Sequence, residues 1–182
     1  MVYIGIGGKN CAGKDTAALY LIKKGFEYYS LSEVLREILI EKKIPLNRKN
    51  LILYANKLRQ ENGPSFLAKK VVERINNKKN GVIVSIRNLA EVNELRKLPD
   101  FYLLIIDSDP KTRYKRMIER NREGDPKTFE DFLRFERLEE ANSETGQQLK
   151  EVLKAGDFKI ENNSTKEELY KKIEQILELI KK

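Results

Sequence analysis

One loop near the N-terminus constrains the fold more than any other feature of the sequence. Residues Gly8 to Lys14 read G-K-N-C-A-G-K, which matches the spacing G-x-x-x-x-G-K. An apolar run from Val2 to Ile6 precedes this loop, and apolar residues at helical spacing follow it from Lys14 to Lys24. The N–H groups of such a loop point at phosphate oxygens, and the start of a helix adds partial positive charge there. The pattern therefore predicts a strand, a phosphate-binding loop and a helix in succession.

The loop assigns a role in phosphate binding to a continuous segment. We expect Lys14 to reach the β- and γ-phosphates of ATP, and we count it among the catalytic residues. The predicted phosphate-binding residues are Gly8, Lys9, Asn10, Cys11, Ala12, Gly13, Lys14, Asp15 and Thr16.

The residues after Lys14 bear on the metal. A Ser or Thr usually follows this lysine and binds Mg²⁺ through its hydroxyl, whereas here Asp15 comes first and Thr16 second. Two interpretations of Asp15 stay open. It is either a hard oxygen ligand, direct or through water, or an acid that the helix dipole favours in the first turn. We predict a Mg²⁺ site at Asp15 and Thr16.

Short apolar runs alternate with helical patterns along the rest of the chain. The expected strands cover residues 2–6, 26–29, 81–86, 101–106 and 158–160. The expected helices cover residues 14–24, 31–41, 50–61, 64–75, 90–97, 110–120, 128–140, 147–154 and 165–180. This alternation predicts an α/β fold with a parallel sheet covered on both faces. A chain of 182 residues without a long linker fits one domain.

Composition excludes several kinds of chemistry. The chain has no histidine and a single cysteine, Cys11, so imidazole acid–base catalysis and a disulfide within the chain are excluded. The net charge of +8 suggests a polyanionic partner, for which we favour nucleotide phosphates over nucleic acid. The alternative, which we favour for most of the lysines, is a solvated surface rich in Lys and Glu. No apolar run reaches membrane-spanning length and the N-terminal run is too short for a signal peptide. We therefore expect a cytoplasmic protein with no membrane partner.

The loop and the following residues, G-x-x-x-x-G-K-D-T, resemble the branch of P-loop kinases that contains bacteriophage deoxynucleotide monophosphate kinases and phosphomevalonate kinases. The whole chain resembles the dephospho-CoA-kinase-like and adenylate-kinase-related nucleotide kinases of archaea and bacteria. Beyond the loop, the stretches that carry this resemblance are residues 30–36, 56–63, 85–92, 124–129 and 160–163.

The resemblance implies an architecture and an activity. The core comprises residues 1–30, 81–111 and 149–182 and contains a five-stranded parallel sheet. A helical acceptor-binding insert covers residues 31–76, and a lid covers residues 112–148. The implied activity is transfer of the γ-phosphoryl group of ATP to a nucleoside or deoxynucleoside monophosphate. A dephospho-CoA kinase-like enzyme and a nucleotide-dependent switch or RNA-associated ATPase are the alternatives.

Arginines are the candidates for holding the acceptor. In related kinases an arginine at the position of Arg36 holds the acceptor phosphate, and a guanidinium suits a phosphate bidentately. The alternative is a helix arginine paired with a neighbouring glutamate. Arg87 follows a strand and is a second candidate, both for the acceptor and for catalysis. Arg59 is a further acceptor candidate. Related kinases carry an aspartate shortly before Arg87, whereas this chain has Val84 and Ser85.

A second group of arginines lies in the expected lid. Arg113, Arg116 and Arg120 are spaced by three and four residues and share one helix face. We expect Arg116 and Arg120 to be catalytic by neutralising charge on the transferring phosphoryl group, the alternative being an amphipathic surface helix. The resemblance places Asn162 and Asn163 at the adenine.

The lack of a histidine also bears on the acceptor. An acceptor phosphate, with a second pKa of about 6, is already mostly dianionic at neutral pH and needs no catalytic base. Dephospho-CoA kinases attack through a ribose hydroxyl and carry an aspartate after the second strand, which residues 29–33 of this chain lack. This favours a phosphate acceptor, and Glu33 keeps the alternative open.

Overall fold

A five-stranded, all-parallel sheet forms the centre of the computed structural model, which describes residues 1–76, 78–122, 124–141 and 148–180. The strand order is β2-β3-β1-β4-β5, and each neighbouring pair is parallel. The strands are β1 (Tyr3–Gly7), β2 (Glu27–Ser30), β3 (Gly81–Val84), β4 (Phe101–Asp107) and β5 (Phe158–Glu161). The predicted α/β fold is confirmed.

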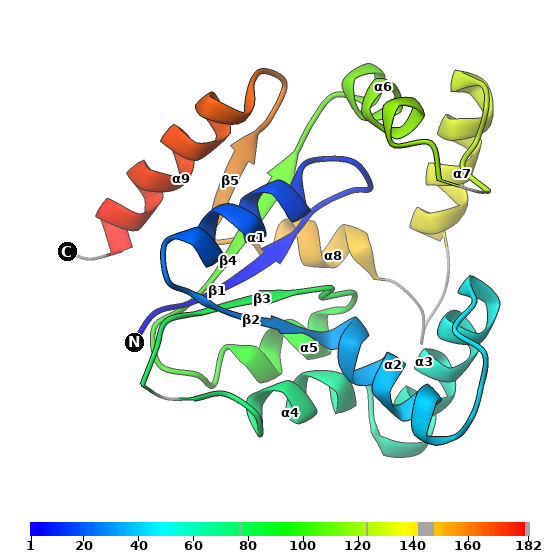
Figure 1. Cartoon of the computed structure of the whole chain (residues 1–182), viewed down its shortest axis with the longest axis vertical. Helices are drawn as coiled ribbons and strands as arrows, with labels where there is room; N and C mark the ends of the chain where they lie inside the picture. Colours follow the sequence, from blue (N-terminus) through cyan, green and yellow to red (C-terminus); the bar gives the residue numbers. More distant parts are fainter. Residues whose placement is uncertain (77, 123, 142–147, 181–182) are drawn as a thin grey trace.

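Helices cover both faces of the sheet (Figure 1). One face packs against α1 (Lys14–Lys23) and α9 (Lys166–Ile180) through a core that includes Ile4, Ile6 and Leu104. The opposite face carries a larger core, to which the remaining core-packing helices contribute: α2 (Leu31–Glu41), α3 (Arg48–Asn62), α4 (Phe66–Val72), α5 (Leu89–Leu95) and α8 (Leu149–Lys154). Strands buried on both faces explain why their sequences are continuous apolar runs.

Several predicted elements are shorter in the structure, and the reason is visible for two of them. β3 ends at Val84, two residues before the predicted end, because Ser85 has a φ of 67° and leaves the extended conformation. The helix expected over residues 64–75 is α4, Phe66–Val72. After it the N–H groups of Arg74 and Ile75 bond three residues back, so the chain turns out of the α-helix.

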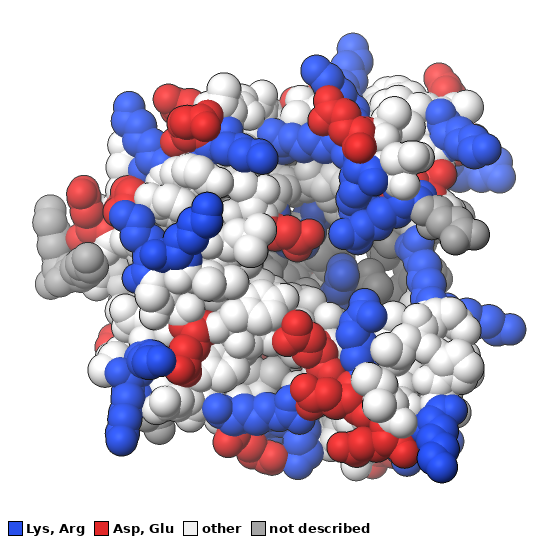
Figure 2. Space-filling model, in the orientation of Figure 1, with Lys and Arg blue, Asp and Glu red and all other residues white. Residues whose placement is uncertain are grey.

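The segments predicted as insert and lid lie on the same side of the molecule (Figure 1). The predicted lid, residues 112–148, contains most of α6 (Pro110–Arg120) and all of α7 (Phe129–Ala141), and its residues 142–147 lie outside the described residues. The guanidinium of Arg48, at the start of α3, stacks on the ring of Phe135 in α7, with its carbon 4.7 Å from the ring centre. Figure 2 shows a hollow between the part that carries α6 and α7 and the part that carries α2 and α3.

No helix in the described part of the chain is both long and apolar enough to cross a membrane.

Candidate functional site

The predicted phosphate loop joins the end of β1 to the start of α1, at the carboxyl edge of the sheet (Figure 1). Its two motif glycines have positive φ angles, 146° at Gly8 and 107° at Gly13. A Cβ atom on Gly8 would lie 2.1 Å from the carbonyl oxygen of Ile106 in β4. The loop therefore needs glycine at this position both for its backbone conformation and for its close approach to the neighbouring strand.

Lys14 begins α1, and its side chain folds back over the loop. Its Nζ donates a hydrogen bond to the carbonyl oxygen of Lys9, with a distance of 2.6 Å. Asp15 is exposed and Thr16 half-buried in the first turn of the same helix. The ammonium group is thus held at the mouth of the loop, where an incoming phosphate would meet it.

The oxygen ligands available near the loop suit Mg²⁺, which keeps several waters, better than they suit a metal ion whose ligands all come from protein side chains. No group of three or more Cys, Asp or Glu side chains in the described ranges gathers to hold an ion. Mg²⁺ usually keeps several waters and is bound through one or two carboxylates and the substrate phosphates. One carboxylate, Asp15, beside one hydroxyl, Thr16, is a donor set of this kind.

Asn162, which follows the edge strand β5, forms a hydrogen bond with the phosphate loop. It follows β5, is 5% exposed, and its Nδ2 donates to the carbonyl oxygen of Ala12 at 2.8 Å. The next residue has different partners, since Oδ1 of Asn163 accepts from Oγ of Ser108 at 3.0 Å and from the backbone N–H of Asp109 at 2.8 Å. The structure therefore separates two asparagines that the sequence assigned to one role.

Asn163 borders a cavity of about 270 Å³ beside the loop. The other residues around it come from the loop, from the ends of β4 and β5 and from the start of α6: Lys9, Asp107, Ser108, Asp109, Pro110, Arg113 and Glu161. Asn162 does not line it. Of the two predicted adenine-binding residues, only Asn163 lines this cavity.

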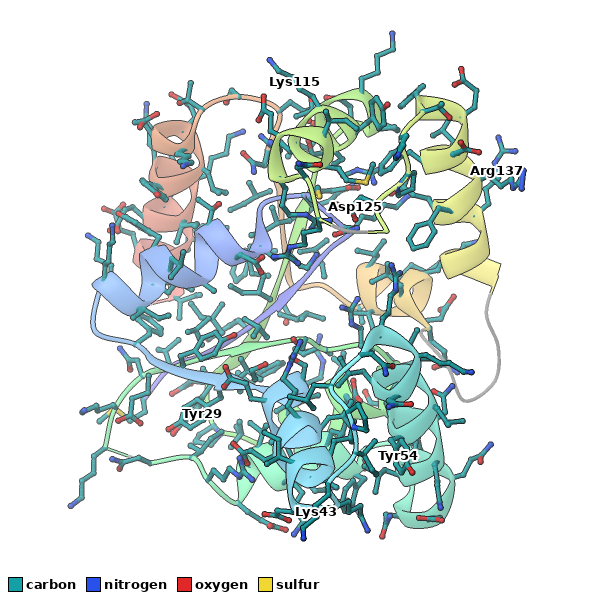
Figure 3. All side chains as sticks on the ribbon, turned by 45° about the vertical axis from the view of Figure 1, so that its right-hand side comes forward. Tyr29, Lys43, Tyr54, Lys115, Asp125 and Arg137 are labelled. Atoms are coloured by element: carbon teal, nitrogen blue, oxygen red, sulfur yellow. The ribbon has the colours of Figure 1, made fainter. Side chains whose placement is uncertain are left out.

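Two lid arginines reach the loop from α6. Arg116 donates to three neutral acceptors, the carbonyl oxygen of Ala12 at 3.5 Å, Oγ of Ser108 at 3.4 Å and the carbonyl oxygen of Ser164 at 3.4 Å. Arg120 donates to Oδ1 of Asn10 at 3.3 Å and forms a bidentate pair with Asp125 at 2.9 and 3.0 Å. Asp125 is labelled in Figure 3.

Arg113, on the same helix, is buried and bonds to other parts of the fold instead of to the loop. It is 1% exposed, donates from Nε to the carbonyl oxygen of Ser108 at 2.8 Å, and pairs with Glu136 of α7 through both terminal nitrogens. The three arginines predicted to share one helix face therefore have different roles in the fold. Arg113 joins α6 to α7, whereas Arg116 and Arg120 approach the phosphate loop.

The thiol of Cys11 lies within the phosphate loop. Burial raises the pKa of Cys11, and the carboxylate of Asp125 adds to the rise, whereas Arg120, Lys14 and Arg122 act in the opposite direction. The balance leaves the pKa above its ordinary value, so this thiol stays protonated at neutral pH. It adds no negative charge where phosphates would bind.

The acceptor candidates are divided in the same way. Arg36 is exposed on α2, and Arg87 is half-buried just beyond β3. Arg59 is 6% exposed and donates to Oε1 of Glu91 from Nε at 3.2 Å and from a terminal nitrogen at 2.9 Å. The other oxygen of Glu91 accepts from the backbone N–H of Arg87 at 2.7 Å. Arg59 therefore fastens α3 to the turn that carries Arg87.

Sequence reasoning missed the anionic partners of these arginines. Glu91 is fully buried at the third position of α5, where it also forms a capping box with Asn88. The spacing of Asn88 and Glu91 is a recognisable signal for a helix start, but not for a pair with α3. No local sequence pattern predicts the pairs formed by Asp125 and Glu136. Arg120, the partner of Asp125, lies on α6 before a turn, and Arg113, the partner of Glu136, lies on a different helix.

The order of the parallel strands and the glycine loop between β1 and α1 give the chain the fold of solved P-loop kinases. A Thermus thermophilus protein, TT1252, has a TM-score of 0.64 at 20% identity and covers 97% of this chain and 96% of its own. Shikimate kinase from Aquifex aeolicus has a TM-score of 0.57 at 19% identity with the same coverage, and APS kinase from Mycobacterium tuberculosis has 0.54 at 18%, covering 97% of both chains.

The chain belongs to the UPF0200 family. It is 31% identical to a UPF0200 protein of Pyrococcus horikoshii over 176 residues, which is 93% of this chain and 92% of the relative. A UPF0200 protein of Saccharolobus islandicus is 33% identical over 181 residues, 97% of this chain and 93% of the relative. The chain spans 55% of the length of a UPF0200/UPF0201 protein of Archaeoglobus fulgidus, at 32% identity. No family model matches the chain.

Proposed function

We propose that this protein is a phosphotransferase that passes the γ-phosphoryl group of ATP to a nucleoside or deoxynucleoside monophosphate. One observation carries the proposal: Lys14, Arg116 and Arg120 come from two elements and meet at the same phosphate loop. A nucleotide-binding loop that only held a phosphate would not need cations from a separate helix. Cations on both sides of the loop suit a transferring phosphoryl group.

The chain's residues divide the work by position. The loop N–H groups bind the donor phosphates, and Lys14 exchanges its bond to the Lys9 carbonyl for a phosphate oxygen. Arg116 and Arg120 approach from α6 and neutralise charge on the transferring group. Asp15 and Thr16 hold Mg²⁺, which supplies further charge neutralisation when bound. Asn163 and its neighbours around the cavity take the base of the donor.

In this proposal the acceptor occupies the hollow that Figure 2 shows. Arg36, exposed on α2, and Arg87, half-buried just after β3, are the residues proposed to bind its phosphate. In this proposal Arg59 is a structural residue, because its guanidinium is occupied by Glu91 in the interior. The absence of histidine supports a phosphate acceptor, which requires positioning and charge neutralisation but no base.

A dephospho-CoA kinase-like activity is the second candidate, and one observation favours it. Glu33, in the first turn of α2, lies close enough to Tyr28 to contribute to the raised pKa of that phenol, after burial as the larger cause. In this candidate function Glu33 is the carboxylate that would take the proton of a hydroxyl acceptor.

A coupled assay of ADP release separates these candidates. The acceptor panel contains nucleoside and deoxynucleoside monophosphates, dephospho-CoA and RNA. We expect stimulation by at least one monophosphate; stimulation by dephospho-CoA alone would support the second candidate. RNA binding that weakens steeply with salt, without acceptor-dependent turnover, would instead support an RNA-associated ATPase.

The proposal predicts that Lys14→Ala abolishes phosphoryl transfer and leaves the fold intact, because the ammonium bonds to a loop carbonyl and does not pack in the core. The measurements are the assay above and thermal unfolding. Lys23→Ala, at the exposed end of the same helix, is the control and should keep full activity. A folded Lys14→Ala variant with wild-type turnover would contradict the proposal that phosphoryl transfer takes place at this loop.

A further inference from the structure

The ion pair between Arg120 and Asp125 lies beside the phosphate loop, and the function proposed above gives its carboxylate no role. One terminal nitrogen of Arg120, Nη2, donates to both oxygens of Asp125, at 3.0 and 2.9 Å. The other terminal nitrogen, Nη1, donates to Oδ1 of Asn10 in the loop at 3.3 Å. A single guanidinium thus joins a carboxylate to the loop that is proposed to bind phosphates.

The guanidinium of Arg120 is incompletely satisfied in this arrangement. Its third nitrogen, Nε, is buried and has no hydrogen-bond partner among the described residues. A buried donor without an acceptor is destabilising. The bond of Nη1 goes to a neutral amide and is longer than most hydrogen bonds of this kind. Asp125 and Asn10 therefore leave part of the hydrogen-bonding capacity of Arg120 unused.

The carboxylate occupies the nitrogen that matters most for binding a phosphate. A guanidinium has two forks, one formed by Nε and Nη2 and the other by Nη1 and Nη2, so an anion bound through two parallel bonds needs Nη2 in either case. Here Nη2 donates to both oxygens of Asp125. A phosphoryl group can therefore bind Arg120 bidentately only after Asp125 has released this nitrogen.

The burial of the pair allows it to open. The side chains of Arg120 and Asp125 are 25% and 15% exposed. Those of Arg59 and Glu91, which form a structural pair, are 6% and 0% exposed. Opening a pair as buried as the second would leave a charge in the interior without a partner, whereas water can solvate the carboxylate of the first.

The backbone on both sides of Asp125 is held in place, so the arginine is the residue that can change partner. The N–H of Asp125 donates to the carbonyl oxygen of Arg122 at 3.1 Å. Two residues after Asp125, the carbonyl oxygen of Lys127 accepts from the hydroxyl of Tyr114 in α6 at 2.7 Å. The long side chain of Arg120 can move from the carboxylate to a ligand on the loop by rotation about its own bonds.

We propose that Asp125 is a positioning residue for phosphoryl transfer. It holds Arg120 above the loop while the site is empty and gives up the guanidinium to the terminal phosphoryl group of the donor nucleotide. The oxygens of that group can accept from Nε and Nη2 together, which satisfies the donor that Asp125 leaves without a partner. This role rests on the function proposed above, and it makes Asp125 a competitor of the donor nucleotide for one catalytic arginine.

The first test compares the binding of a non-hydrolysable ATP analogue and of ADP by titration calorimetry in the presence of Mg²⁺. Asp125→Asn should bind the analogue about three- to tenfold more tightly than the wild type, because a neutral amide competes for Arg120 less strongly than a carboxylate. ADP, which lacks the terminal phosphoryl group, should show a smaller gain. Glu119→Gln is the matched control, since it removes the same charge from the exposed neighbour of Arg120 on α6 and should leave both affinities unchanged.

The second test follows the Nε–H group of Arg120 by proton–nitrogen correlation NMR of the wild-type protein, so it does not depend on the folding of an Asp125 variant. Arg120→Lys identifies the signal by its loss. Saturation with the ATP analogue should move the signal to higher proton frequency, because the N–H gains a phosphate oxygen as its acceptor. ADP should leave the signal near its position in the free protein.

The outcomes separate the two proposals. A wild-type protein that binds neither nucleotide would contradict the proposed phosphotransferase, and this inference with it. The wild type may be found to bind the analogue while the Nε–H signal does not move, or Asp125→Asn to bind it no more tightly than Glu119→Gln. In either case Arg120 stays on Asp125, and only this inference is overturned. Thermal unfolding shows whether Asp125→Asn is folded under the conditions of the titration.

Discussion

At the scale of single residues, the arginines differ in how deeply they are buried and in whether a carboxylate already binds them. Arg113 and Arg59 are almost completely buried against Glu136 and Glu91, whereas Arg36 is exposed on α2. A buried guanidinium that already holds a carboxylate contributes to the fold, because removing it would leave a charge without a partner. An exposed guanidinium without a buried carboxylate partner can meet a ligand without such a loss.

Arg36→Ala should lower kcat/KM for the acceptor roughly ten- to 150-fold with little effect on ATP affinity, because one charge-assisted bidentate contact is worth about 1.5–3 kcal/mol. Steady-state kinetics with varied acceptor measure this change. Arg36→Lys should restore only part of the rate, since lysine keeps the charge and loses the planar fork. Near-wild-type kinetics in both variants would make Arg36 a surface helix residue and leave Arg87 as the acceptor ligand.

The thiol of Cys11 should react with iodoacetamide along a pH profile whose midpoint lies above that of the unfolded chain. Burial raises the pKa of Cys11, and only the thiolate is nucleophilic, so the folded protein needs a higher pH for the same reactive fraction. Mass spectrometry of the alkylated peptide gives the profile. Asp125→Asn should move the midpoint down, because that carboxylate raises the pKa. Equal midpoints for folded and unfolded chain would contradict this account.

At the scale of elements, the ends of α6 decide where its arginines point. The side chain of Asp109 accepts from the backbone N–H of Thr112, Pro110 occupies the first turn, and Asn121 ends the helix in the left-handed conformation. The hydrogen bonds from Thr112 hold the pKa of Asp109 below its ordinary value, so this cap stays ionised. A helix fixed at both ends places Arg116 and Arg120 over the loop instead of leaving them to solvent.

The pair between Arg113 and Glu136 should be a main support of the lid. Glu136→Ala leaves the Arg113 guanidinium buried without its carboxylate, and we expect a loss of about 3–5 kcal/mol in the free energy of unfolding. Urea denaturation measures this loss. The double variant Arg113→Met/Glu136→Leu should lose much less, since it removes both charges.

An exposed pair provides the control for that experiment. Arg74 and Glu37 lie 2.6 Å apart with side chains 46% and 50% exposed, so Glu37→Ala should change stability by less than about 1 kcal/mol. Similar losses for Glu136→Ala and Glu37→Ala would show that burial of the lid pair has no energetic consequence.

At the scale of the whole molecule, the insert and the lid face each other across the hollow and touch where Arg48 stacks on Phe135. The phosphate loop lies at the carboxyl edge of the sheet, on the side of the molecule toward α6 (Figure 1). Ligands of open α/β sheets bind at the carboxyl ends of the strands, so two substrates entering the hollow would meet at the loop.

Nucleotide binding should therefore stabilise the whole fold. At an ATP–Mg²⁺ concentration 100 times the Kd, the gain is about 2.7 kcal/mol, which corresponds to a Tm rise of roughly 5–11 °C for a chain of this size. Differential scanning calorimetry over a series of ATP concentrations measures it. The shift should grow with concentration and shrink in Lys14→Ala. A Tm that does not depend on ATP would argue against a nucleotide site.

Much of the architecture was predictable because it depends on neighbours along the chain. The glycine spacing before Lys14 and the alternation of apolar runs with helical patterns are local signals, and the structure confirms a parallel five-stranded sheet. The C-terminal end of β3 was less predictable, because no local sequence pattern indicates that Ser85 has a left-handed backbone conformation. Its hydroxyl lies 3.3 Å from that of Ser32 on α2, a contact between residues distant in the sequence.

The sequence by itself determined the loop, the sheet and the set of candidate arginines, because glycine geometry and hydrophobic periodicity act within a few residues. Only the tertiary structure decided which of these side chains face the hollow. Arg59 meets Glu91 across 32 positions, and Asn162 meets the loop across 150. Partners so far apart in the chain carry no shared local pattern, and whether a charge is buried or free depends on what the fold places beside it.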